Sequence, residues 1–138
     1  MSARPARPEA PVPALVLDAG AFVAVDRGDR AMAARLRVAQ RGGIELRSNG
    51  AVVAQVWRDP SGRQAELARL LRSVDVRPVD QRLGQDAGAL SGRSGAGDAV
   101  DATVVAIANA GDRILTSDPS DIRALVSVSG RSVLVVPC

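Results

Sequence analysis

The chain has 138 residues and a formal net charge of +3; its 18 basic residues are all arginine, it has no histidine, and its one cysteine is Cys138. This length predicts one domain with a buried core, a single cysteine excludes an intramolecular disulfide, and the apolar stretches are too short to span a bilayer, so we expect a soluble protein of the reducing cytoplasm. Without lysine there is no Walker-type phosphate loop, and without histidine there is neither a Ser-His-Asp triad nor metal-free RNA cleavage by a histidine pair.

The predicted elements begin after a segment rich in proline and arginine. Residues 1–13 (MSARPARPEAPVP) contain no continuous apolar run, so we expect a disordered tail and a single domain over residues 14–138. Apolar runs and helical periodicity then predict, in order, a strand at 14–18, helices at 19–25 and 30–41, a strand at 44–47, and helices at 51–58 and 62–72.

The second half of the chain continues the same alternation. It predicts a strand at 74–79, a helix at 80–91, a glycine-rich loop at 91–97, a helix at 99–110, a strand at 113–116, a helix at 119–128 and a last strand at 132–136. Strands that alternate with helices indicate the α/β class, with a mostly parallel sheet covered by helices on both faces.

Acidic residues follow two of the apolar strands. Asp18 comes after ALVL, Asp118 comes after ILTS, and Asp98 and Asp101 open the helix between them. Strand tips of an open α/β sheet carry the functional groups, so we expect these acids to meet at one point. Carboxylates without imidazole or thiolate favour Mg²⁺ or Mn²⁺ over zinc, and their mutual repulsion predicts at least one raised pKa.

Each acid also has a purely structural explanation. Asp98 and Asp101 fit a helix capping box, and Asp118 fits an N-cap followed by proline, with Asp121 three residues further on. Taken singly, each acid fits a cap as well as a ligand. Taken together, with a further acid after the first strand, they favour a metal site.

Charge is distributed unevenly along the chain. Residues 26–72 contain ten arginines and five acids, whereas residues 73–138 contain six arginines and eight acids. A basic flank beside an acidic pocket suits a polyanionic substrate that a cation bridges to carboxylates. The alternative is a solvated helix surface with scattered arginines.

Four segments, LVLDAGAFVAV, AVVAQVWR, GDAVDATVVAIA and ILTSDPSDI, together resemble a PIN domain, close to the VapC-type toxin ribonucleases of bacterial toxin–antitoxin pairs. The resemblance implies a three-layer α/β/α sandwich with strand order 3-2-1-4-5. It implies that Asp18, Asp101 and Asp118 are metal ligands, that Asp98 is a further acid of the pocket, and that Thr116 or Ser117 supports the site. It also implies a homodimer and a small antitoxin protein that blocks the pocket.

Gln55 departs from the family pattern, which usually has glutamate at this position. Glutamine keeps one carbonyl acceptor but loses the charge, so Gln55 would position a metal-bound water and bind a cation less strongly. Next to it, Arg58 and Trp57 would pair with or stack on RNA, although a lone tryptophan on an apolar helix is more often part of the core.

From these features we expect a Mg²⁺- or Mn²⁺-dependent endoribonuclease that acts as the toxin of a two-component system. Arginines of the basic half, among them Arg30 and Arg58, would bind the RNA backbone. The alternatives are a degenerate PIN domain that binds RNA or a partner protein without cleavage and, less favoured because no Asp-x-Asp follows the first strand, a metal-dependent phosphatase.

Overall fold

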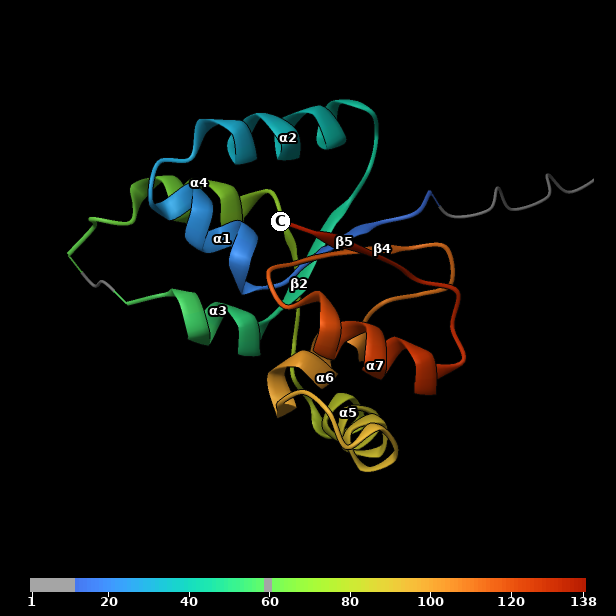
Figure 1. Ribbon diagram of the computed structural model, residues 1–138. Coiled ribbons are helices and arrows are strands. Elements are labelled where there is room, and N and C mark those ends of the chain that lie inside the picture. The colour runs from blue at the N-terminus through green and yellow to red at the C-terminus, as the bar shows by residue number, and fades with distance from the viewer. Residues whose placement is uncertain (1–11, 59–60) are drawn as a thin grey trace, which may run out of the picture.

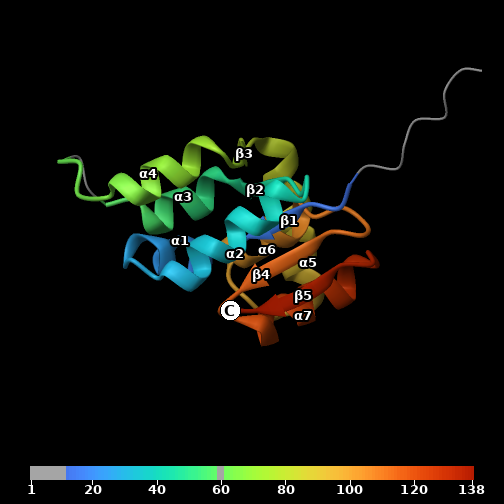
Figure 2. The ribbon, with the colours of Figure 1, turned by 90° about the horizontal axis from the view of Figure 1, so that it is seen from above.

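The computed structural model describes residues 12–58 and 61–138, in which the chain forms a five-stranded parallel sheet with helices on both faces (Figure 1). The strands are β1 (Leu15–Leu17), β2 (Leu46–Asn49), β3 (Asp75–Arg77), β4 (Arg113–Thr116) and β5 (Leu134–Pro137). Their order across the sheet is β3-β2-β1-β4-β5, which Figure 2 shows from one edge to the other. This confirms the expected α/β/α sandwich and its strand order.

The helices form the two outer layers. They are α1 (Ala19–Asp26), α2 (Arg30–Arg41), α3 (Gly50–Val56), α4 (Ala65–Arg72), α5 (Gln81–Ser94), α6 (Ala99–Ala106) and α7 (Pro119–Ser129). In Figure 1, α1, α2 and α4 lie on one side of the sheet and α5, α6 and α7 on the other, while α3 packs against both α1 and α6. No helix in the described parts of the chain is long and apolar enough to cross a membrane.

The core lies around the two central strands. Val16 and Leu17 of β1 and Ile114 and Leu115 of β4 are fully buried, with Leu17 in register with Leu115. Burial of such side chains contributes about 1.5–3 kcal/mol each, so the carboxyl ends of β1 and β4 are held firmly side by side.

A buried ion pair fixes the opposite ends of the strands. Arg47 Nη1 lies 2.9 Å from Asp112 Oδ2, and the Asp112 carboxylate also accepts the backbone N–H groups of Ala14 and Asn109 at 2.8 Å. Asp112 is therefore a buried acid with its charge and its acceptors satisfied.

Several predicted boundaries differ from those of the structure, and a distant partner or a turn explains three of the differences. Strand β2 begins two residues later than expected, since its polar residues are buried with partners on other elements. Helix α6 ends at Ala106, where Arg131 Nη1 donates to the carbonyl oxygens of Val105, Ala106 and Ala108. Helix α5 continues to Ser94, into the expected loop, and ends at Gly95, whose φ of 65° is a left-handed helix cap. Of the expected tail, residues 1–11 lie outside the described part of the chain.

Candidate metal centre

The first acid of the site, Asp18, follows β1 and is 5% exposed. Its Oδ1 accepts the backbone N–H of Ala19 at 2.8 Å, which makes Asp18 the N-cap of α1. Its Oδ2 accepts the hydroxyl of Thr116, a buried residue at the end of β4, at 2.8 Å, and Thr116 Oγ1 in turn accepts the N–H of Asp118 at 2.9 Å. Thr116 thus holds the ends of β1 and β4 in one hydrogen-bonded chain that fixes the Asp18 carboxylate.

A pair of acids, Asp98 and Asp101, opens α6. Asp98 Oδ1 accepts the N–H of Asp101 at 2.8 Å, and Asp101 Oδ2 accepts the N–H of Asp98 at 3.3 Å, so the predicted capping box is present. The box fixes both side chains and leaves carboxylate acceptor capacity unused, because each carboxylate oxygen has two lone pairs. A structural role and a ligand role are therefore compatible for Asp101.

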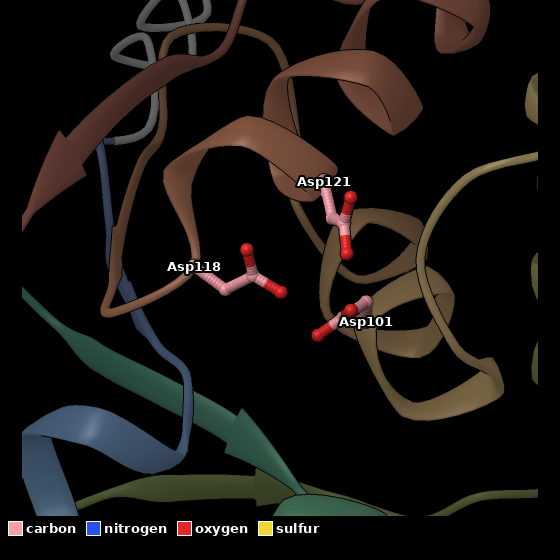
Figure 3. Close-up of side chains that lie close together, drawn as sticks. All are labelled: Asp101, Asp118 and Asp121. Atoms are coloured by element: carbon pink, nitrogen blue, oxygen red, sulfur yellow. The ribbon is translucent and has the colours of Figure 1, made fainter.

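A second pair, Asp118 and Asp121, lies at the start of α7 and completes the group of acids. Asp118 occupies the N-cap position, but its side chain makes no capping hydrogen bond, contrary to the cap interpretation of this residue. Carboxylate oxygens of Asp101, Asp118 and Asp121 lie within 4.8 Å of one another, and the three side chains point toward a common point (Figure 3). Asp121 was expected only as a capping residue. Its spacing of three from Asp118 places both on one helix face, which could have revealed it.

Two members of the three-acid group, Asp101 and Asp121, have raised pKa values. Burial is the largest cause that raises the pKa of Asp101, to about 6, and the charges of Asp98, Asp18 and Asp118 raise it further. The Asp118 charge is the first cause that raises the pKa of Asp121. This matches the repulsion expected from a carboxylate cluster, and Asp18 is close enough to contribute to it.

No arginine neutralises this cluster in the described residues, since none of the salt bridges found there includes Asp18, Asp98, Asp101, Asp118 or Asp121. Asp112, by contrast, has the Arg47 guanidinium 2.9 Å away as its counter-charge. Converging hard oxygen donors without a counter-charge fit a divalent cation such as Mg²⁺ or Mn²⁺ and offer no soft ligand for zinc.

One solved structure has a closely related architecture. The chain superposes on a chain of VapBC2 from Rickettsia felis, bound to a DNA fragment from their promoter, with a TM-score of 0.66 and 11% sequence identity, over 90% of this chain and 98% of that chain. The chain has a PIN-like fold. No protein-family model and no curated protein sequence matches it.

Within this PIN-like fold, the other expected site residues lie at different places. Thr116 forms a hydrogen bond with Asp18, as described above. Ser117 is exposed and lies so close to Gly20 that a Cβ atom at position 20 would be only 2.8 Å from Ser117 Oγ. Gln55 is exposed near the end of α3. Arg30 is the exposed first residue of α2.

The two residues after α3 differ in their surroundings. Arg58 Nη1 donates to the carbonyl oxygens of Ala54 and Trp57, so its guanidinium caps the end of α3. Trp57, expected in the core, is 39% exposed, and that expectation was wrong. Helix α3 ends at Val56, where the side chain of Gln64 forms two hydrogen bonds with the backbone. Gln64 Nε2 donates to the Val56 carbonyl oxygen, and Gln64 Oε1 accepts the Arg58 N–H. Trp57, between them, has an extended backbone conformation and lies outside the helix.

A shallow hollow of about 610 Å³ adjoins the site on the α1 side. It is lined by Ala19 and Ser117, which neighbour Asp18 and Asp118 in sequence, and it extends along α1 to Arg27. Alanine, glycine and serine form half of its lining, and larger residues such as Arg27, Asp29 and Met32 form much of the rest.

Proposed function

We propose that the chain is a divalent-metal-dependent endoribonuclease and the toxin of a toxin–antitoxin pair. The observation that carries this proposal is the convergence of the Asp101, Asp118 and Asp121 carboxylates beside the carboxyl ends of β1 and β4. In the part of the chain that the structure describes, no arginine forms a salt bridge with them. Functional groups of open α/β sheets gather at this edge.

Each residue has a distinct part in the proposed reaction. Asp101, Asp118 and Asp121 would hold Mg²⁺ or Mn²⁺, and Asp18, fixed by Thr116, would complete the acidic pocket. Bound there, the cation would lower the pKa of a water and neutralise charge on the phosphodiester. Asp98 would position Asp101 through the capping box, and Gln55 would accept a hydrogen bond from water without adding charge.

RNA is the proposed substrate because basic residues accompany the acidic pocket. Exposed arginines of α2 and the neighbouring elements would bind phosphates, and Arg27 is among the residues that line the hollow along α1. Phosphate binding by arginine is electrostatic and depends on salt, which provides a direct check.

The proposed partners are an antitoxin and a second copy of the chain. Support comes from the similar fold of a chain in VapBC2 from Rickettsia felis. An antitoxin that places a cationic side chain among the three acids would neutralise the charge that the cation neutralises in the active enzyme.

Gln55 favours a second candidate, a PIN-like domain that binds RNA or a protein without cutting. A site with an amide in place of a carboxylate has lower negative charge and a weaker hold on a divalent ion.

A cleavage assay separates the two candidates. The purified protein is incubated with single-stranded RNA in Mn²⁺ or Mg²⁺, with EDTA and Asp118→Asn as controls. Cleavage that needs the cation and disappears in the variant supports the ribonuclease. Retained RNA binding without cation-dependent cleavage supports the non-cutting candidate.

A further inference from the structure

A buried amide lies at the end of β2, next to the proposed metal centre. Asn49 is fully buried, and its Oδ1 accepts the N–H groups of Ala51 at 2.9 Å and Val52 at 3.2 Å, which makes it the N-cap of α3. These two bonds fix the plane of the amide. In this orientation the Nδ2 group points across the fold to α6.

The partner on α6 is Thr103. Asn49 Nδ2 donates to Thr103 Oγ1 at 3.1 Å, and the Thr103 hydroxyl donates to the Val100 carbonyl oxygen at 2.6 Å. Val100 and Thr103 flank Asp101 in the first turns of α6. The two bonds form one chain from the tip of β2 to the backbone that carries a proposed ligand, and such chains strengthen cooperatively in a low-dielectric interior.

Helix α6 is thereby placed between two sets of contacts. Thr103 connects it to Asn49, whereas Asp101 points toward Asp118 and Asp121 on α7. A shift of the first turn of α6 would change the distances among the three carboxylates, which repel one another. Among residues 12–58 and 61–138, no arginine forms a salt bridge that would hold these carboxylates together.

We propose that Asn49 is a positioning residue which, through Thr103, sets the place of Asp101 in the metal centre; this inference rests on the proposed function. Asn49 also caps α3, the helix that contains Gln55, so one uncharged amide connects helix α3 with helix α6. In this chain the connection does not depend on a carboxylate at position 55.

Thr103→Val and Thr103→Ser test the inference directly. Valine keeps the branched shape and removes the hydroxyl, while serine keeps the hydroxyl. Removal of a group that orients a ligand costs about ten- to a hundredfold in metal affinity. We expect Thr103→Val to weaken Mn²⁺ binding in calorimetry by about tenfold and Thr103→Ser to restore most of it. Asn49→Ser, which retains a capping side chain for α3, should weaken Mn²⁺ binding similarly, and the double variant with Thr103→Val should be no weaker than either single one.

Arg131→Met is the matched control, because it removes the three bonds that cap the other end of the same helix. It should lower thermal stability and leave Mn²⁺ affinity within about twofold, since distant sites act independently. If Thr103→Val lowers stability but leaves Mn²⁺ affinity at the wild-type value, Asn49 and Thr103 are structural only and the inference is overturned. If the wild type itself binds no Mn²⁺, the proposed function fails, and this inference with it.

Discussion

Asp101→Asn should stabilise the cation-free protein at neutral pH. The pKa of Asp101 is raised from 3.8 to about 6, first by burial and then by the neighbouring acids, so the charged form is disfavoured in the folded state. One pKa unit corresponds to about 1.4 kcal/mol, which bounds the penalty at about 3 kcal/mol. Solvent screening of the half-exposed carboxylate reduces this to roughly 1 kcal/mol. Asparagine keeps the acceptor that the Asp98 N–H requires.

The penalty has a defined pH window. Because the folded pKa lies above the unfolded one, the folded state binds more protons between the two values, and stability falls as pH rises from about 4 to about 6. The penalty is present in full above that range. Asp101→Asn should therefore gain roughly 4 °C in Tm at about pH 7.5 and nothing near pH 4.

The assay is thermal unfolding of both proteins in EDTA at the two pH values, with Asp112→Asn as the matched control. Asp112 is also a buried acid, but it is the nearest partner of the buried Arg47, at 2.9 Å, whereas Glu45 and Asp75 lie 3.6 Å and 3.9 Å from Arg47 Nε. Its loss removes the nearest counter-charge of this guanidinium and should cost about 3–5 kcal/mol. Added Mn²⁺ should raise the Tm of the wild type more than that of Asp101→Asn. A gain that is equal at both pH values, or a loss like that of Asp112→Asn, would refute the reasoning.

Three further predictions concern the cation and the RNA. Asp18→Asn, Asp118→Asn and Asp121→Asn should each weaken Mn²⁺ binding in calorimetry while the circular dichroism spectrum stays unchanged; equal affinities in all of them would reduce these acids to structural roles. RNA affinity should fall with salt, with a slope of about −0.7 per phosphate contact, and replacement of Arg30, Arg35 and Arg37 should flatten the slope; a salt-independent affinity would contradict this. Gln55→Glu should raise divalent affinity and strengthen its pH dependence, because a further carboxylate must lose its proton to bind; unchanged affinity would show that residue 55 points away from the centre.

The arrangement of the fold follows from local patterns in the sequence. Each predicted strand and helix is present, because apolar runs such as 14–17 and 114–115 are buried in a parallel sheet and flanking glycine and proline residues end elements. The strand order followed from the resemblance to the PIN family, since periodicity does not determine which strands are neighbours.

Long-range partners explain what the sequence could not predict. Strand β2 is buried although it contains Arg47 and Asn49, because Asp112 and Thr103 lie opposite them in the folded chain. Trp57 lies outside the core because Gln64, seven residues later, forms hydrogen bonds with the backbone of Val56 and Arg58 and so ends α3 before Trp57.

The sequence predicted that the acids form a cluster, but it did not predict which of them lie closest together. Asp18 and Asp118 were selected by their places after strands, Asp101 by its place at the start of a helix, and all three by the family resemblance; the structure adds Asp121 to the closest set. Asp121 joins the group because of the first turn of α7. The Asp118 side chain makes no capping hydrogen bond there and points toward Asp121 and Asp101 instead.

Anomalous diffraction from crystals soaked in Mn²⁺ tests the central claim most directly. A single metal site at the carboxyl ends of the sheet predicts an anomalous peak bounded by the carboxylates of Asp101, Asp118 and Asp121, which disappears in Asp118→Asn crystals treated in the same way. No peak at this point in the wild type, or a peak that persists in the variant, would contradict it.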